Sequence, residues 1–195
     1  MPNWCNNDLV LSHKDSKMID RAIAAFNEEK FFNEFVPRPI ALDSDDNLWK
    51  VNPEYFMELQ ELKKQLNIKH YGYPSWYEWN LAHWGTKWDS GGQDYIINRI
   101  SENKIECSFD TAWSPPIDFY KRMAELGFEI DAQYYECGMM FCGSFYYTSE
   151  DGISDDHYTI EEATSEWVLK NIPKDIDEAF AISEQMMMDE LEVEE

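Results

Sequence analysis

The chain has 195 residues, 44% of them hydrophobic and 15% aromatic, which is enough apolar material for the core of one domain and excludes a disordered chain. Its 39 acidic residues against 16 basic ones give a formal charge of −23 at pH 7. Because a polyanion repels phosphate groups, this charge argues against direct, sequence-independent binding of DNA or RNA.

The sequence carries no signal for a membrane or for secretion. A membrane-spanning helix needs about eighteen consecutive apolar residues, and no such run occurs. Residues 1–7 contain neither the basic nor the apolar segment of a secretory signal. We therefore expect a cytoplasmic protein whose four cysteines are reduced and partly buried.

The first part of the chain is predicted to alternate strands and helices. Residues 9–11 form a short strand, and a helix capped near Asp15 follows. Residues 31–36 are predicted to form a second strand, closed by prolines. After an acidic loop at residues 43–47, a helix is expected to begin near Pro53.

Residues 71–95 contain eight aromatic side chains in one short stretch. Ser75 is placed to begin a short helix there, and Gly91 and Gly92 suggest turns after it. Clustered aromatic residues are more often packing than a platform for stacked bases. We therefore predict an aromatic-rich helical insertion, spanning about residues 40–100, that covers the core.

The second half has the clearest periodicity. Apolar residues alternate with polar ones at residues 105–113 and 128–134, and residues 139–147 are rich in aromatics, so three strands are predicted. Between the first two, Ser114 is expected to cap a helix with Pro115 at its first position. The polar side of these strands offers acidic residues where RNA-recognition sheets offer basic and aromatic ones, which disfavours RNA binding.

These elements predict an α+β fold: a ferredoxin-like antiparallel sheet with helices packed on one face. Residues 1–148 would form this domain, including the insertion. Residues 149–195 would form an acidic helical extension, with helices at about 160–169 and 176–187 separated by Pro173.

Four motifs identify a family resemblance. They are Met1-Pro2-Asn3-Trp4-Cys5-Asn6-Asn7, Trp84-Gly85-Thr86-Lys87-Trp88-Asp89, Phe109-Asp110-Thr111-Ala112-Trp113-Ser114-Pro115-Pro116 and Tyr135-Glu136-Cys137-Gly138-Met139-Met140-Phe141-Cys142-Gly143. In this order they resemble the YubB-type ferredoxin-like domain family of uncharacterised bacteriophage and plasmid proteins. The resemblance implies a fold, a mobile-element origin and a bacterial host cell, and it supplies no catalytic residues.

The motif residues are interpreted as structural. Large rings of this kind hold an insertion onto a sheet, and Lys87 with Asp89 is read as an ion pair or, alternatively, a polar site. The residues assigned this structural role are Trp4, Asn6, Trp84, Lys87, Trp88, Asp89, Trp113 and Pro115.

The C-terminal region carries most of the excess charge. Residues 149–195 contain 16 acidic and 2 basic residues, a net −14 of the total −23. One interpretation is a solvated terminus, and the other is an acidic surface presented to a basic partner. The candidate partner-binding residues are Asp151, Asp155, Asp156, Glu161, Glu162 and Glu166.

Catalytic and metal motifs are weak. A nucleophile could be built from Cys5 with His13, or from a cysteine with His83, but no signature frames either pair. Cys137 and Cys142 lack the second pair that a zinc site needs. No cofactor and no metal are therefore expected.

These observations lead to the hypothesis of a non-enzymatic interaction protein of phage or plasmid origin. It would bind a host protein that has a basic surface, and would inhibit or redirect a defence or nucleic-acid-processing system, with carboxylates standing in for phosphates. Two further functions stay open. One is a small enzyme with a His, Asp or Cys site near residues 83–113, and the other is an oligomeric, virion-associated protein with exposed aromatics such as Tyr146 and Tyr147 at a self-interface.

Overall fold

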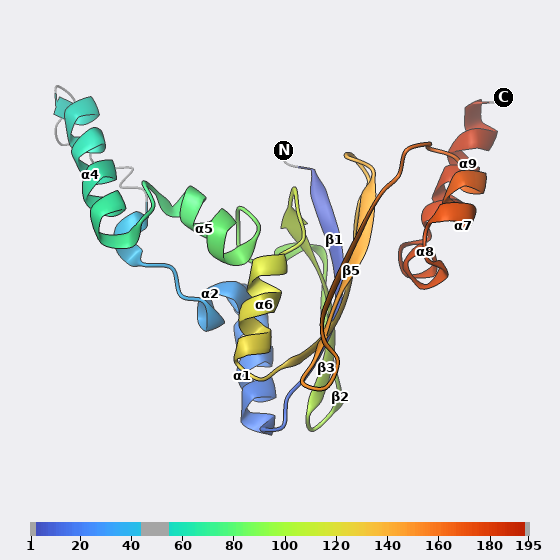
Figure 1. The fold of residues 1–195 in the computed structure, drawn as a ribbon, viewed down its shortest axis with the longest axis horizontal. Coiled ribbons are helices and arrows are strands. Elements are labelled where there is room, and N and C mark those ends of the chain that lie inside the picture. Colours follow the sequence, from blue (N-terminus) through green and yellow to red (C-terminus); the bar gives the residue numbers. More distant parts are fainter. Residues whose placement is uncertain (1–2, 44–54, 194–195) are drawn as a thin grey trace.

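A single antiparallel sheet forms the centre of the molecule (Figure 1). The computed structural model describes residues 3–43 and 55–193. The strands lie in the order β2-β3-β1-β4-β5-β6. Their bounds are β1 (Trp4–Ser12), β2 (Gly91–Ser101), β3 (Lys104–Ala112), β4 (Glu129–Glu136), β5 (Phe141–Thr148) and β6 (Gly152–Thr159).

Two helices complete the ferredoxin-like unit. Helix α1 (Ser16–Asn27) follows β1, and α6 (Ile117–Glu125) joins β3 to β4. The chain order β1-α1-β2-β3-α6-β4, with β3 and β1 at the centre of these four strands, is the split βαβ arrangement that the sequence predicts. The expected α+β, ferredoxin-like fold is therefore confirmed, and β5 and β6 extend its sheet.

The main core lies between the sheet and these two helices. Alternate side chains of β1, β3 and β4 point to the same side, as the pleat requires, and meet the apolar stripes of α1 and α6. The largest contributors are fully buried aromatic rings, and those of Phe32 and Phe119 lie 4.5 Å apart.

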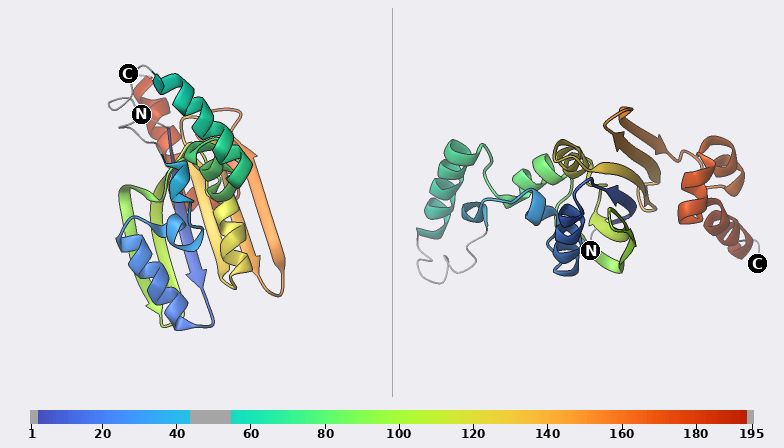
Figure 2. Two further views of the ribbon diagram at one scale, coloured as in Figure 1. Left: turned by 90° about the vertical axis from the view of Figure 1, so that its left-hand side faces the viewer. Right: turned by 90° about the horizontal axis from the view of Figure 1, so that it is seen from below.

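The insertion lies between α1 and β2. It comprises α2 (Phe31–Phe35), the 3₁₀ helix η1 (Ile40–Leu42), α4 (Phe56–Tyr71) and α5 (Trp76–Trp84). Helix α5 packs against α6 and buries Trp79 and Trp84. Helix α4 extends away from the sheet, as Figure 1 and the right-hand view of Figure 2 show.

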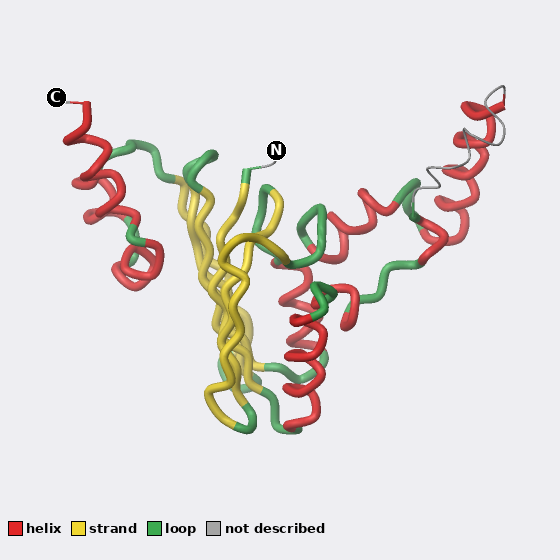
Figure 3. The backbone as a smooth tube through the Cα atoms, turned by 180° about the vertical axis from the view of Figure 1, so that it is seen from behind, coloured by secondary structure: helices red, strands yellow, loops and turns green. Residues whose placement is uncertain are grey.

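The C-terminal helices cover part of the opposite face of the sheet, seen from behind in Figure 3. They are α7 (Ser165–Asn171), α8 (Lys174–Phe180) and α9 (Ile182–Val193). They enclose a second, smaller core in which Ile176 and Ile182 pack with Cys142 of β5. Two helices were expected here, and three form, because Ala181 adopts a left-handed conformation (φ 50°) between α8 and α9.

Residues 31–36 do not form the predicted strand. Residues 31–35 form helix α2, in which Phe31, Phe32 and Phe35 are all buried. Residues three and four positions apart share one helical face, so this spacing suits a short helix that presents all three rings to the core. The second strand of the ferredoxin-like unit is instead β2.

Two strands were missed by the sequence interpretation. Residues 91–101 form β2, so the predicted insertion at 40–100 includes a strand of the sheet. Residues 152–159 form β6, paired with β5, so the region after residue 148 begins with a strand and turns helical only at Ser165.

The helix predicted to begin at Ser114 and Pro115 begins at Ile117. A residue that precedes a proline is disfavoured in the helical region, and Pro115 precedes Pro116, so the helix starts only after both prolines. The predicted start at Pro53 lies outside the described residues, as does most of the loop at 43–47. Within residues 3–43 and 55–193, no helix is long and apolar enough to cross a bilayer.

Candidate functional site

The four sequence motifs meet at one end of the sheet. The register places Trp4 opposite Ala112 and Cys5 opposite Glu136, which brings the first, third and fourth motifs side by side. The second motif joins them where the hydroxyl of Thr86 donates to the carbonyl of Ala112 at 3.0 Å. Segments that are far apart in the chain thus form one polar and aromatic cluster.

Two asparagines of β1 stabilise this cluster. The amide of Asn7, 1% exposed, donates to the carbonyl of Cys5 at 2.8 Å and to the hydroxyl of Thr111 at 2.9 Å. On the other face of β1, the amide of Asn6 donates to Asp110 at 2.7 Å. The bonds to Thr111 and Asp110 join β1 to β3, so the motif asparagines hold the central strands together.

Glu136 is fully buried at the end of β4. Its carboxylate accepts hydrogen bonds from the backbone N–H groups of Gly138 and Met139, which form the turn into β5. A Cβ at Gly138 would lie 2.4 Å from the side chain of Asn3. The fourth motif therefore shapes a turn that closes against the first motif.

Lys87 lies among three aromatic rings. Its Nζ is 4.5 Å from the ring centroid of Trp88, 4.7 Å from that of Trp113 and 6.0 Å from that of Tyr77. The ring of Trp4 lies 6.0 Å from that of Trp88. We name these five residues the Lys87 cage. The arrangement is one that stabilises an ammonium group by cation–π attraction.

Asp89 does not form the ion pair with Lys87 that the sequence suggests. Its carboxylate accepts from the backbone N–H groups of Phe32 and Asn33 at 2.7 and 2.9 Å and so caps α2. Burial raises the pKa of Asp89 above its ordinary value, against the lowering effect of these backbone donors. Lys87 and Asp89 are thus neighbours in sequence with different structural roles.

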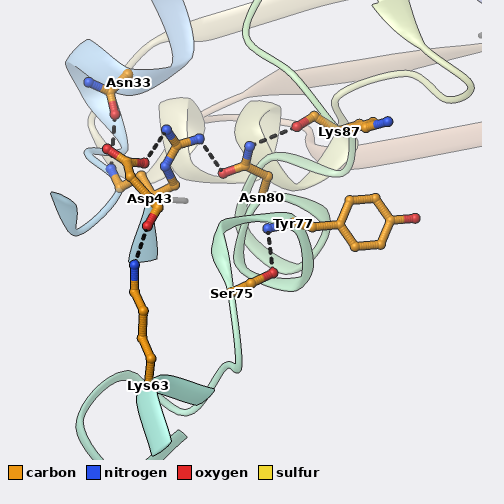
Figure 4. A network of polar contacts seen from close by, with 8 residues as sticks. Asn33, Asp43, Lys63, Ser75, Tyr77, Asn80 and Lys87 are labelled. Atoms are coloured by element: carbon orange, nitrogen blue, oxygen red, sulfur yellow. Dashed lines mark hydrogen bonds and ion pairs between the residues drawn. The ribbon is translucent and has the colours of Figure 1, made fainter. Parts of the chain in front are cut away.

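A network around Arg38 holds the insertion against the second motif (Figure 4). The guanidinium of Arg38 pairs with Asp43 at 2.6 Å and donates to the side chain of Asn80 at 3.3 Å. Asn80, fully buried, donates in turn to the carbonyl of Lys87 at 2.7 Å. Lys63 of α4 donates to the carbonyl of Asp43 at 2.6 Å. The network fixes the backbone from which Lys87 projects.

The remaining motif residues divide into buried and exposed ones. Trp84 is 2% exposed and donates to the carbonyl of Val36, and Pro115 is buried. In contrast, Trp4, Trp88 and Trp113 are 40%, 39% and 38% exposed. These three exposed rings leave apolar surface on the molecule, which core packing alone does not explain.

The face of the sheet opposite α1 and α6 is strongly acidic. We name it the open face. Among the described side chains, β1, β3 and β4 direct five carboxylates and one cation, Lys104, to this side, and β6 adds Asp156. The five carboxylates are Asp8, Glu106, Asp110, Glu129 and Asp131.

The partners of three of these carboxylates are neutral. Asp8 accepts from the hydroxyl of Ser108, Glu106 from the amide of Asn98, and Glu129 from the hydroxyl of Ser12. A neutral donor orients a carboxylate without cancelling its charge. Asp110 is buried, and the exposed carboxylates Glu106, Glu129 and Asp131 present their negative charge to the solvent.

The six predicted partner-binding carboxylates do not form one patch. Asp151 lies in the β5–β6 turn, and Asp155 and Asp156 lie on opposite faces of β6. Glu161 and Glu162 are exposed beyond the other end of β6, and Glu166 is in the first turn of α7. Of the six, Asp156 shares the open face. Because the sequence did not predict that residues 152–159 form a strand, it did not predict that Asp155 and Asp156 lie on opposite faces of the sheet.

A groove separates the upper part of the open face from α9. Its volume is about 850 Å³, and it is lined by Asn6, Tyr135, Phe180, Met186, Asp189 and Glu190, among others. Its lining combines the rings of Tyr135 and Phe180 and the side chain of Met186 with the carboxylates of Asp189 and Glu190. Glu190 also accepts from the backbone N–H and hydroxyl of Ser165 and so stabilises the start of α7.

The cysteines considered as nucleophiles are buried, and the histidines considered as their bases make other contacts. Burial, with a smaller contribution from Glu136, raises the pKa of the Cys5 thiol, and burial likewise raises the pKa of Cys107. His83 stacks on Trp79 and hydrogen-bonds its carbonyl, and His13 lies beyond the far end of β1. A neutral buried thiol is a poor nucleophile.

The structure also describes the residues considered for a metal centre and those considered for a tyrosine self-interface. Among the described residues, no group of three or more His, Cys, Asp or Glu side chains could hold a metal ion. Tyr146 is 38% exposed on the open face, whereas Tyr147 packs against the main core.

A comparison with family models agrees with the fold. Residues 83–182, slightly more than half of the chain, match a family model described as "Ferredoxin-like domain in Api92-like protein". A crystal structure of protein api92 from Yersinia pseudotuberculosis is similar with a TM-score of 0.47 and 13% sequence identity, covering 83% of this chain and 100% of that chain. No curated protein matches the sequence.

Proposed function

We propose that this chain, which belongs to the family of Api92-like proteins with a ferredoxin-like domain, uses its sheet as a scaffold for protein binding rather than for catalysis. The protein would be carried by a bacteriophage or plasmid, act in the host cytoplasm, and bind a host protein that has a basic surface. The observation that carries this proposal is the open face, on which Asp8, Glu106 and Glu129 accept hydrogen bonds from neutral side chains and keep their negative charge.

Charge complementarity gives the proposal its physical basis. A negative face attracts a basic surface from a distance, which raises the association rate and makes it sensitive to salt. A basic surface of this kind is the one that proteins use to bind nucleic acid phosphates. The proposed partner is therefore a component of a defence or nucleic-acid-processing system, and binding would block its phosphate site.

Two further features support a protein partner. Asp156 of β6 adds a further carboxylate to the open face. The exposed tryptophans of the Lys87 cage lie at the end of the same sheet, and tryptophan is among the residues most enriched at the energetic centres of protein interfaces.

A capture experiment with matched variants tests the proposal. Purified protein would be immobilised and exposed to bacterial lysate at low and high salt. The open-face variant Glu106→Gln/Glu129→Gln/Asp131→Asn removes three charges, and the control variant Glu28→Gln/Glu58→Gln/Glu61→Gln removes three from α4 and the end of α1.

The expected result is a partner that is captured at low salt by the wild type and by the control, and that is lost with the open-face variant. Release of the captured partner by duplex DNA would support phosphate mimicry. A partner that binds the open-face variant as tightly as the wild type would refute the role of this face.

A further inference from the structure

The sheet has two edge strands, and they differ in regularity. β2 forms one edge, and its pairing with β3 is interrupted by two register shifts. β6 forms the other edge, pairs with β5 without a shift from Gly152 to Thr159, and contains no proline. Bulges normally protect an edge from pairing with another chain, so β2 has this protection and β6 does not.

The outward side of β6 carries backbone groups that β5 does not use. The N–H of Ile160 donates to the carbonyl of Met140 at 2.7 Å, in the same register as β6 and β5. In an antiparallel pair every second residue of a strand bonds to its neighbour. Since Ile160 bonds to Met140 in this register, the even-numbered residues of β6 bond to β5 and the odd-numbered ones do not. The N–H and C=O groups of Ile153, Asp155, His157 and Thr159 therefore point away from the sheet, and these side chains are exposed.

The charges at the centre of β6 determine which strand could pair there. One strand that could pair with β6 is β6 of a second copy of the protein. In a two-fold symmetric antiparallel pair, the two registers nearest the centre of the strand would place Asp155 opposite Asp155 or Asp156 opposite Asp156. Like charges directly opposite each other are destabilising, so the pair opposes self-association. The same pair would attract a strand with basic residues at these positions.

We propose that the β6 edge binds an extended segment of a partner protein as a seventh strand, and that this segment carries two adjacent basic residues opposite Asp155 and Asp156. Adjacent residues of a strand point to opposite faces, so one cation meets Asp155 on the helix side and the other meets Asp156 on the open side. Main-chain hydrogen bonds give the affinity, and the paired charges select the sequence. This inference rests on the proposed function, because it specifies how a basic partner is held.

The test uses an eight-residue peptide of valine and threonine with two adjacent lysines at its centre. Its binding would be measured by fluorescence anisotropy at low salt. We expect a peptide with glutamates in place of the lysines to bind at least about tenfold more weakly. A peptide with the same lysines but with alternate backbone nitrogens methylated, so that it cannot donate to β6, should bind at least about fivefold more weakly, which corresponds to one lost hydrogen bond.

Variants of the protein separate the backbone from the charge. Asp155→Asn and Asp155→Pro remove the same charge, but only proline removes the outward N–H, which β5 does not use. We expect Asp155→Pro to bind the peptide about fivefold more weakly than Asp155→Asn does, and Glu161→Gln/Glu162→Gln to bind as the wild type does. Thermal unfolding would check that the proline variant is folded, and the methylated peptide tests the same point on the unaltered protein.

Failure of this inference is distinguishable from failure of the proposed function. If the methylated peptide binds as tightly as its parent, strand addition is refuted. The open-face experiment above then decides separately whether the acidic surface binds a basic protein. If the glutamate peptide binds as tightly as the lysine peptide, charge selection at β6 is refuted.

Discussion

The carboxylate of Asp89 lies 2.7 Å from the backbone nitrogen of Phe32, across 57 positions of the chain. It accepts from the next N–H, that of Asn33, as well. Lys30, at the N-cap position of α2, makes no side-chain cap bond, so Asp89 supplies the cap from a different segment. The second motif therefore ties the loop after α5 to the start of α2.

Replacing Asp89 should destabilise the fold. In Asp89→Ala the two N–H groups of α2, one of them partly buried, lose their acceptor, and we expect a loss of about 1–2 kcal/mol in the free energy of unfolding. Asp89→Asn keeps one oxygen and should lose less. Urea denaturation measures both, and equal stability of the alanine variant and the wild type would contradict the capping role.

Replacing Lys87 should separate cation–π attraction from packing. In Lys87→Met the apolar stem remains but the charge is lost, and we expect a loss of about 1 kcal/mol. Lys87→Arg should retain most of the stability. The tryptophan fluorescence spectrum would report the change at Trp88 and Trp113, and a methionine variant with unchanged stability and spectrum would argue that the cage does not hold the ammonium group.

Gly143 should not tolerate a side chain. A Cβ there would lie 2.2 Å from the carbonyl oxygen of Asp156 and 2.4 Å from the hydroxyl of Tyr134, so Gly143→Ala must push β6 away or displace the tyrosine. We expect a destabilisation of about 2–3 kcal/mol in thermal or urea unfolding.

The matched control for Gly143 is Gly91→Ala. Gly91 is also a strand glycine, and a Cβ there would meet nothing within 4 Å. It should change stability by less than about 1 kcal/mol. If Gly143→Ala and Gly91→Ala change the free energy of unfolding by the same amount, the close approach of β5 to β6 is not the reason for glycine at position 143.

The smaller core should weaken at alkaline pH. Burial raises the pKa of Cys142 from 9.0 to about 12, and burial raises that of Tyr135 from 10.0 to about 12. A group whose pKa is raised on folding contributes stability that is present below its unfolded value and lost as the pH rises through its folded value. Stability should therefore fall as the pH rises from about 9 towards 12.

Thermal unfolding at several pH values between 8 and 11 would measure this slope. Cys142→Ala should reduce it, because one of the groups no longer titrates. Met139→Ala, which removes no titratable group from an exposed position, should leave the slope as it is in the wild type. An unchanged slope in Cys142→Ala would mean that this thiol does not contribute.

Much of the fold could be predicted because its central strands alternate clearly. In β3 and β4 apolar residues point one way and the carboxylates, except that of Glu136 at the end of β4, point the other, so the orientation of these strands in the sheet follows from the sequence. The acidic open face could be recognised in the same way from Glu106 and Asp131. The aromatic insertion could be recognised from its composition.

The edge strands could not be predicted, for different physical reasons. β6 is exposed over most of its length, so burial imposes no apolar alternation on it, and its aspartates suggest a loop. β2 begins with two glycines and carries exposed isoleucines at 96 and 100 beside the inward-facing Ile97, which conceals its alternation. The cap that Asp89 provides depends on tertiary contact and leaves no local pattern.

The position of β1 at the centre of the sheet has a consequence for folding. Its neighbours β3 and β4 are contributed by segments far along the chain, as the bond between Asn6 and Asp110 across 104 positions illustrates. During synthesis β1 emerges before β3 and β4, so neither of its edges can be paired until those later segments have been made. Contacts of such high sequence separation slow folding, so a nascent chain of this protein spends longer than a helical bundle does with unpaired backbone and is more dependent on chaperones.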